Sequence, residues 1–276
     1  MGAQKIVVSK KLLQKLYIKD NLTPHKIGEI LGCSFKTIRN RLEEHSIPFK
    51  DPAYARMSYD KKDFKGTLKE RAYMIGFRMG DLNVYKKSPD SYTIVVRCHT
   101  TQEQQVSVIK SLFSKFGKVT ASHNDGHFQV NCFLNNSFSF LLKKDDSVWK
   151  WIKNIDDDIV AFSFISGYTD AEGNFIINQG KARFKIDSYD SSILNWMSRW
   201  LKKKGINNKL RIIYKKGEKI PSQSPFPKDL WRLNINDMKS LRLFILRLRF
   251  LLRHKTRILQ ANKSLSNIHN RKIYYE

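Results

Sequence analysis

The sequence has few acidic residues relative to basic ones, and this imbalance is its strongest compositional signal. Among 276 residues there are 25 Asp and Glu against 51 Lys and Arg, a formal net charge of +26, with a pI of about 10.0. Solubility alone does not require so large a charge. The composition therefore predicts a polyanionic partner, and nucleic acid is the expected one.

The sequence also lacks long apolar runs and cysteine pairs. No run approaches the roughly 20 apolar residues that a helix needs to span a bilayer, and the first residues lack the apolar region of a secretion signal. The cysteines Cys33, Cys98 and Cys132 are widely spaced in apolar contexts, which favours buried thiols over a disulfide or a zinc site. We therefore expect a protein of the cytoplasm (nucleoid-associated) or of an organelle, without membrane contact.

One nine-residue pattern occurs twice in the chain. Residues 165–173 form an apolar run that ends in a carboxylate and a glycine, and residues 74–82 place a glycine, an aromatic, a small residue and an acid at the same relative positions. In each copy small residues recur four apart, Gly76 with Gly80 and Gly167 with Ala171, so another backbone can approach that face of the helix. The pattern predicts a pseudo-symmetric pair of helices, each with an acid at its end.

After each motif helix the hydrophobic period changes from that of a helix to that of a strand. A capping box at Thr67 and Glu70 starts the first helix, and an acidic cluster at 156–158 starts the second. We expect strands at 83–87, 92–99, 118–124 and 127–133 around a helix at 102–116, and strands at 174–179, 182–187, 209–215 and 230–236 around a helix at 190–204. The order is αββαββα twice, closed by an apolar helix at 238–265 that is kinked or broken near its basic cluster.

Each half presents a polar sheet face, because apolar and polar residues alternate along the strands. These faces carry basic, amide and hydroxyl side chains, which suit contacts with nucleic acid. The expected contact residues are Asn83, Tyr85, Lys87, Thr93, Arg97, His99, Gln129 and Asn131 in the first half, and Asn174, Asn178, Arg183, Lys185, Lys209, Arg211, Lys215, Arg232 and Asn234 in the second.

The N-terminal residues predict a helix-turn-helix with helices at 10–18, 24–31 and 35–45 and a tight turn at Gly32 and Cys33. The third helix would present Lys36, Thr37, Arg39, Asn40 and Arg41 to base edges and phosphates. A small structural helical cap with solvated charges is the alternative. The predicted domains are this unit over 1–46, a basic linker over 47–66, a first repeat over 67–155 and a second over 156–276.

With this repeat and this order of elements, the chain resembles the LAGLIDADG homing endonucleases in their single-chain, two-motif form. The second copy matches closely, and the first departs at Arg78, Met79 and Leu82, where the family prefers an apolar residue, an acid and a glycine. The resemblance implies an α+β fold in which two antiparallel sheets form a saddle over the DNA major groove. It also implies that the motif helices pack at a pseudo-twofold axis and that a monomer acts on a long, specific site in double-stranded DNA.

The resemblance further implies a metal-dependent phosphodiester hydrolase connected with intron mobility. The family's catalytic acid carries over to Asp81 and Glu172, which would hold Mg²⁺ or Mn²⁺, with Ca²⁺ supporting binding without cleavage. Relatives also place a basic residue near the cleavage centre of each half, and Lys255 and Lys144 (or its neighbour Lys143) are the candidates. Asp170 is expected to cap or pack, because its counterpart in the first copy is Met79.

Two other functions fit the same residues. A DNA-binding regulator that no longer cleaves would keep the sheets and the helix-turn-helix after decay of the motif. An intron-splicing maturase would use the same charge on RNA, because DNA and RNA phosphates attract basic residues alike.

Overall fold

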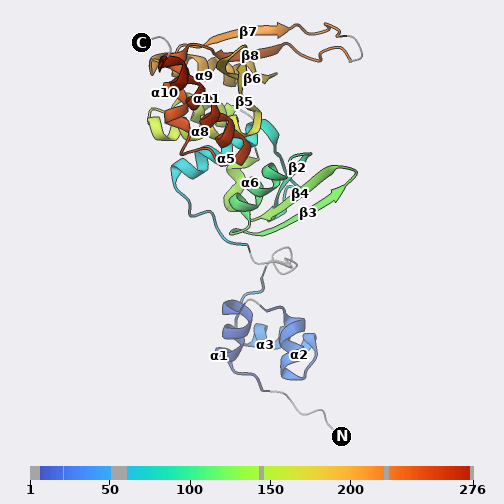
Figure 1. Cartoon of the computed structure of the whole chain (residues 1–276). Helices are drawn as coiled ribbons and strands as arrows, with labels where there is room; N and C mark the ends of the chain where they lie inside the picture. The colour runs from blue at the N-terminus through green and yellow to red at the C-terminus, as the bar shows by residue number, and fades with distance from the viewer. Residues whose placement is uncertain (1–6, 21, 51–60, 143–145, 221–223, 274–276) are drawn as a thin grey trace. The chain divides into compact units, whose positions relative to one another are not determined.

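The computed structural model describes residues 7–20, 22–50, 61–142, 146–220 and 224–273. The chain divides into two compact units, Met1–Ser58 and Tyr59–Glu276, which we call the N-terminal unit and the main unit and describe separately (Figure 1). No helix within the described ranges combines the length and hydrophobicity that crossing a membrane requires.

The N-terminal unit is helical and has a tight turn where the sequence predicts one. Gly32 ends the second helix with a φ of 67°, a left-handed conformation that glycine adopts readily. A Cβ at Gly28 would lie 2.5 Å from the carbonyl oxygen of Cys33, so this close approach requires glycine. The helices are α1 (Lys10–Leu13), which continues as a π-helical segment (Gln14–Lys19), α2 (Pro24–Leu31) and α3 (Phe35–Glu44).

The main unit contains two four-stranded antiparallel sheets, each with the same strand order. The first sheet runs β1-β2-β4-β3 and the second runs β5-β6-β8-β7. The strands are β1 (Asn83–Lys86), β2 (Ile94–Thr100), β3 (Lys118–Asn124), β4 (His127–Leu134), β5 (Gly173–Asn178), β6 (Lys181–Ser188), β7 (Lys209–Tyr214) and β8 (Leu230–Ile235). These bounds confirm the eight expected strands and the α+β class.

The helices of the main unit complete two αββαββα repeats, with one addition at the C-terminal end. Of the two expected forms of the final helix over 238–265, kinked or broken, the structure has the broken one, and its second part continues to Ile273. The helices are α5 (Leu68–Asp81), α6 (Glu103–Phe113), a 3-10 segment (Asn136–Leu141), α7 (Asp146–Lys153), α8 (Asp158–Glu172), α9 (Ser191–Lys203), α10 (Met238–Leu248) and α11 (Lys255–Ile273).

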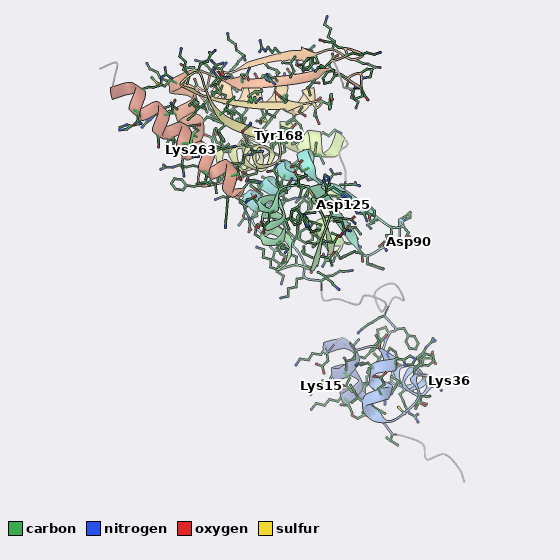
Figure 2. All side chains as sticks on the ribbon, turned by 45° about the vertical axis from the view of Figure 1, so that its right-hand side comes forward. Lys15, Lys36, Asp90, Asp125, Tyr168 and Lys263 are labelled. Carbon is green, nitrogen blue, oxygen red and sulfur yellow. The ribbon has the colours of Figure 1, made fainter. Side chains whose placement is uncertain are left out.

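The motif helices α5 and α8 pack directly against each other through their glycines. A Cβ at Gly76 would lie 2.0 Å from the carbonyl oxygen of Phe164, and one at Gly167 would lie 2.1 Å from that of Tyr73. Real atoms cannot approach so closely, so each glycine admits the backbone of the other helix. Tyr168 lies in the same contact, in the interior of the main unit (Figure 2). The predicted pseudo-symmetric pair is therefore confirmed.

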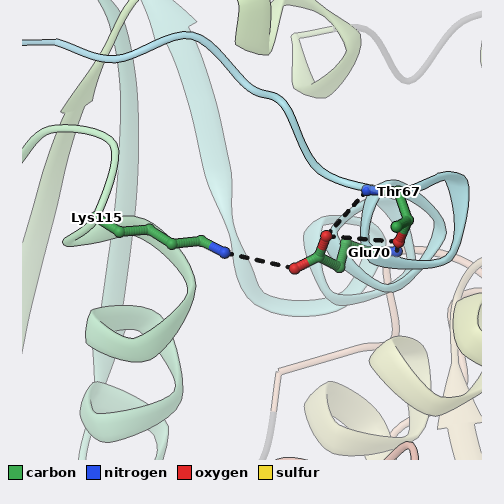
Figure 3. Close-up of polar contacts among 3 residues, drawn as sticks. All are labelled: Thr67, Glu70 and Lys115. Carbon is green, nitrogen blue, oxygen red and sulfur yellow. Dashed lines mark hydrogen bonds and ion pairs between the residues drawn. The ribbon is translucent and has the colours of Figure 1, made fainter.

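Both motif helices begin at the expected caps. The Thr67 hydroxyl accepts from the backbone N–H of Glu70 at 3.2 Å, and the Glu70 carboxylate accepts from that of Thr67 at 2.9 Å (Figure 3). Lys115 also reaches Glu70, 3.4 Å away. Asp157 caps α8 by accepting from the backbone N–H of Val160. Local capping residues therefore define where both motif helices start.

A single apolar core joins the two repeats, and helices cover one face of each sheet. In the second sheet Phe184 and Ile186 of β6 are fully buried, while Arg183 and Lys185, which alternate with them, are partly exposed. Helices α9, α10 and α11 contact this sheet and lie on the same side of it in the ribbon (Figure 1). The other face of the second sheet is left to the polar side chains.

Candidate nucleic-acid interface and carboxylate site

Two carboxylates lie at the ends of the paired helices. Asp81 is the last residue of α5 and Glu172 is the last residue of α8, and both are partly exposed. A Cβ at Gly80 would lie 3.0 Å from Cγ of Glu172, so the Glu172 side chain sits beside the residue that precedes Asp81. The C-terminal end of a helix carries partial negative charge, so two acids placed here call for a compensating cation or hydrogen-bond donors.

A chain of hydrogen bonds orients Asp81. Gln105 of α6 donates its Nε2–H to Oδ2 of Asp81 at 2.5 Å, and the Thr100 hydroxyl at the end of β2 donates to Oε1 of Gln105. Thr100 and Gln105 are both buried, which restricts their rotamers. Sequence reasoning missed Gln105, because an amide on a covering helix gives no signal until the helix is packed on its sheet.

One guanidinium lies within electrostatic reach of both carboxylates. Arg257 is in the first turn of α11, where burial lowers its pKa and the carboxylates of Asp170, Asp81 and Glu172 oppose that shift. Its Nη1 donates to Oε1 of Gln260 at 3.2 Å. Its Nε is buried without a hydrogen-bond partner in the described part of the chain. Arg257 therefore brings a positive charge and an unused donor to the carboxylate site.

Arg257, and not Lys255, is the basic residue that the structure brings to the carboxylates. Lys255 opens α11 with an exposed side chain. Residues two apart on a helix point about 200° apart, so only one of this pair can turn inward, and the break before α11 decides which. Lys144 and its neighbour Lys143, the candidates of the first half, lie outside the described residues.

Asp170 joins the helix pair to the start of α11. Its Oδ2 accepts from the Tyr73 hydroxyl at 2.6 Å and from the backbone N–H groups of Arg253 at 2.6 Å and His254 at 3.2 Å. Burial raises the pKa of Asp170 to about 6, and these hydrogen bonds oppose that rise. The expected capping or packing role is confirmed. Through it Asp170 holds the segment that leads into Arg257.

The departure at Arg78 has a structural role in the first half. The side chain is buried, and its guanidinium donates to the carbonyl oxygens of Leu141 at 3.0 Å and Leu82 at 2.5 Å. Burial lowers its pKa to about 10. Leu82 is the C-cap of α5, so Arg78 satisfies a carbonyl beside Asp81. Met79 and Leu82, the other two departures, are buried apolar residues.

The open face of the second sheet gathers the expected contact residues around a hollow of about 200 Å³. One of them, Arg232, is paired with an acid, because two hydrogen bonds of 2.6 and 2.5 Å join its guanidinium to Asp187. This pairing reduces its charge toward a phosphate and leaves its neighbours as the stronger cations. The expected residues that line the hollow are Asn178, Arg183, Lys185, Arg211, Arg232 and Asn234.

The open face of the first sheet is less charged and more internally bonded. Arg97 donates its Nε–H to Oδ1 of Asn131 at 2.9 Å and lies 5.6 Å from the ring centre of Tyr85. Lys61, from the segment before α5, donates to the Thr93 hydroxyl at 2.5 Å. Among the expected contact residues, the exposed ones are Asn83, Lys87 and His99 in this sheet and Asn178, Lys209, Arg211 and Lys215 in the second.

In the N-terminal unit, α3 presents only part of the expected set. Lys36, Arg39 and Asn40 are exposed, and Lys36 projects from the unit's surface (Figure 2). Thr37 is partly buried and contacts the N-cap hydroxyl of Ser34. Arg41 corrects the expectation, because it is buried and forms an ion pair with Glu44. It lies one turn after the core residue Ile38, which places it toward the inner side of α3.

Among the described residues, no group of three or more His, Cys, Asp or Glu side chains is arranged to hold a metal ion. The carboxylate site offers two such residues, Asp81 and Glu172. Both present the hard oxygen ligands that Mg²⁺, Mn²⁺ and Ca²⁺ prefer. A cation here would need further oxygen ligands from elsewhere.

Comparisons with known proteins found one family model and one curated relative. Residues 160–248 match the family model of the LAGLIDADG-like domain, a range that begins in α8 and ends with α10. An uncharacterized protein of Methanocaldococcus jannaschii, MJ0398, is 25% identical over 201 residues, which are 69% of this chain and 70% of that protein.

Similar solved structures include a homing endonuclease and a DUF199/WhiA protein. Variants of the homing endonuclease I-DmoI are 17% identical, with a TM-score of 0.47 over 66% of this chain and 95% of theirs. Full-length DUF199/WhiA from Thermatoga maritima is 13% identical, with a TM-score of 0.46 over 76% of this chain and 62% of that one.

Proposed function

We propose that the protein is a DNA endonuclease that hydrolyses one phosphodiester bond in each strand of double-stranded DNA, with Asp81 and Glu172 as its catalytic acids. The observation that carries this proposal is the pairing of two carboxylates at adjoining helix ends. Each helix leads directly into the first strand of a sheet with a polar open face. The match of residues 160–248 to the LAGLIDADG-like domain includes Glu172 and supports the proposal.

The two acids fit a divalent cation. Mg²⁺ is commonly held by one or two carboxylates, with substrate phosphates and waters as its other ligands, which agrees with a site of two acids in the described part of the chain. The converging helix ends add partial negative charge. When bound, such a cation would polarise the phosphate and make water a better nucleophile at neutral pH. Mn²⁺ fits the same ligands, and Ca²⁺ is expected to support binding without cleavage.

The surrounding residues have separate tasks in this proposal. Gln105 fixes the orientation of the Asp81 carboxylate through its 2.5 Å hydrogen bond. Arg257 supplies a fixed positive charge beside the carboxylates, where negative charge develops on the phosphate during hydrolysis. The basic open faces would hold the duplex by its phosphates and base edges.

A cleavage assay tests the proposal. A library of duplexes is incubated with the full chain and Mg²⁺, and the cut sequences are recovered. Asp81→Asn and Glu172→Gln are each expected to slow cleavage by about a hundredfold or more, the scale of losing a catalytic group. Asp125→Asn is the matched control, because Asp125 is exposed in the β3–β4 turn with a φ of 50°, which Asn tolerates. Absence of cleavage in every duplex would overturn the proposal.

A DNA-binding protein that does not cleave is the second candidate, and one observation favours it. Arg257 and Gln105 already compensate the two carboxylates, as they would in a site that no longer takes a metal. This candidate predicts that Mg²⁺ changes neither the DNA nor the protein's affinity for it. It also predicts that Asp81→Asn and Glu172→Gln bind the selected duplex as tightly as the unmodified chain.

We infer that the N-terminal unit adds affinity through Lys36, Arg39 and Asn40 of α3, whose side chains are exposed. Deleting residues 1–50 should weaken binding of the selected duplex at least tenfold while cleavage at high protein concentration continues. Equal affinity of the truncated and full chains would contradict this role.

A further inference from the structure

The helical layer over the second sheet contains no acidic residue. Helices α9, α10 and α11 together include many Lys and Arg residues and no Asp or Glu. The nearby acids Asp190 and Asp237 are the N-caps of α9 and α10 and accept backbone N–H groups. We call seven exposed cations of this layer the helical basic face: Arg199, Lys202, Lys203, Lys239, Arg242, Arg247 and Lys263.

The absence of acids distinguishes this layer from the helices α6 and α7 of the first repeat, which contain both acids and bases. In the first repeat the corresponding helix α6 carries one acid, Glu103, and one base, Lys110. Within the described ranges, none of the seven cations forms an ion pair. Like charges on neighbouring turns repel one another and destabilise the fold. A bound polyanion would relieve this repulsion.

The helical basic face points away from the surface proposed to hold the first duplex. The buried sides of α9, α10 and α11 contact the second sheet, so their exposed sides are turned outward, and Lys263 projects from the outer side of α11 (Figure 2). Arg183, Lys185 and Arg211 line the hollow on the open face of the same sheet. A straight duplex lying on one of these surfaces does not reach the other.

The chemistry of the face suits the backbone of a duplex. Its cations stand among aliphatic, Ser and Asn side chains, as in the exposed Asn262, Lys263 and Ser266 of α11. Proteins that hold single strands stack bases on rows of aromatic rings. Near the described part of this face, the strongly exposed ring of Phe250 lies under the Arg249 guanidinium, 4.4 Å away. Phosphate contacts without stacking indicate double-stranded nucleic acid.

We propose that the helical basic face binds the phosphates of a second segment of double-stranded DNA, so that one protein molecule bridges two segments. The inference rests on the proposed function for the first segment, which occupies the open sheet faces. DNA is the favoured polyanion because a duplex held on one side continues beyond the protein and brings its other segments to a high effective concentration.

Two matched variants of the full chain test the bridge. The helical-face variant combines Arg199→Glu, Lys202→Glu, Arg242→Glu and Lys263→Glu. The sheet-face variant combines Arg183→Glu, Lys185→Glu, Lys209→Glu and Arg211→Glu, which changes the net charge by the same amount. The selected duplex is immobilised, the protein is added, and retention of a second, fluorescent duplex is measured at two salt concentrations. Circular dichroism checks that both variants fold.

The expected results separate the two surfaces. The helical-face variant should hold the immobilised duplex within about twofold of the unmodified chain but retain at least tenfold less of the second duplex, with a shallower salt dependence. The sheet-face variant should lose affinity for the immobilised duplex. Sedimentation should show one protein chain for two duplexes.

The possible failures are distinguishable. Undiminished bridging by the helical-face variant would overturn the inference and assign the second contact elsewhere, for instance to the N-terminal unit. Stronger retention of a double-stranded RNA than of DNA would overturn the choice of partner. Failure of the unmodified chain to bind the immobilised duplex would instead overturn the proposed function.

Discussion

The two repeats of the main unit share a backbone plan but hold their acids by different means. The helix contact is symmetric, because Gly76 and Gly167 each admit a carbonyl of the other helix at nearly the same distance. The surroundings are not. In the first repeat Thr100, at the end of β2, reaches Asp81 through Gln105.

In the second repeat the corresponding strand end has another partner. Ser188, at the end of β6, accepts from the Tyr168 hydroxyl at 2.8 Å, and α11 adds Arg257, for which the first repeat has no equivalent helix in its described part. The contact between the two helix backbones leaves no room for a side chain at Gly76 or Gly167, so it stays the same in both repeats. Side chains around it can be exchanged one at a time, so the chemistry of the two halves diverges.

The largest expected effect is a loss of stability when the symmetric contact between α5 and α8 is disturbed. Gly76→Ala and Gly167→Ala should each lower the free energy of unfolding by more than about 3 kcal/mol, above the usual cost of overpacking, because the added methyl would meet a backbone carbonyl at 2.0 or 2.1 Å. Gly80→Ala should also destabilise the fold, because its methyl would lie 2.4 Å from the Cβ of Ala171, which is fixed to the backbone. Denaturant unfolding measures all three. Clearly unequal losses for Gly76 and Gly167 would contradict a symmetric contact.

The next effect is a pH-dependent loss of stability that depends on Asp170, whose counterpart in the first repeat is the apolar Met79. Because burial raises its folded pKa to about 6, above an unfolded value near 3.9, its contribution to stability is present below about pH 4 and is lost as the pH rises through about 6. Relative to Asp170→Asn, the unmodified chain should therefore lose about 3 kcal/mol between pH 4 and 7.5.

Denaturant unfolding at several pH values checks this difference. Met79→Leu is the matched control in the first repeat, because it changes no titratable group and its stability difference should stay constant over the same range. A constant difference for Asp170→Asn would show that burial does not perturb this carboxyl.

A smaller effect should appear in only one repeat. Gln105→Leu removes the donor to Asp81, and a hydrogen bond to a charged group contributes about 1.5 kcal/mol or more. We expect cleavage of one DNA strand to slow about tenfold while the other strand is cut at its normal rate. Gln104→Leu is the control, because Gln104 is the exposed neighbour on α6. Equal slowing of both strands would assign Gln105 a general structural role.

The smallest expected effect is a difference between the cleavage rates of the two DNA strands by the unmodified protein. Asp81 and Glu172 differ by one methylene and have different neighbours, so the two strands should be cut at rates that differ a few-fold, within the range that a small change in geometry produces. A nicked duplex should then accumulate during a time course of cleavage. Equal cleavage rates for both strands would show that the different surroundings of Asp81 and Glu172 do not affect catalysis.

Much of this architecture was predictable from short-range patterns. The strand bounds follow from alternation, as in Phe184 and Ile186 against Arg183 and Lys185, because side chains on a strand point to opposite faces in turn. The helix starts follow from local caps such as Thr67 with Glu70. The helix pair follows from small residues four apart, because their spacing equals the turn of a helix. All of these are relations between residues close together in the chain.

The surroundings of the acids were not predictable in this way. Gln105 meets Asp81 only because α6 packs on the first sheet, and Arg257 turns inward only because the break after α10 sets the rotation of α11. Arg41 lies toward the inner side of α3 instead of facing outward, because it follows the core residue Ile38 by one turn and pairs with Glu44.

The amino-acid order was thus sufficient for the elements, their repetition and the positions of Asp81 and Glu172, because periodicity and capping act within a few residues. Tertiary packing alone decided which donors and cations reach those acids and which basic residues become a separate outer face. Those contacts join residues far apart in the chain, and their geometry depends on how whole helices are rotated and docked against the sheets.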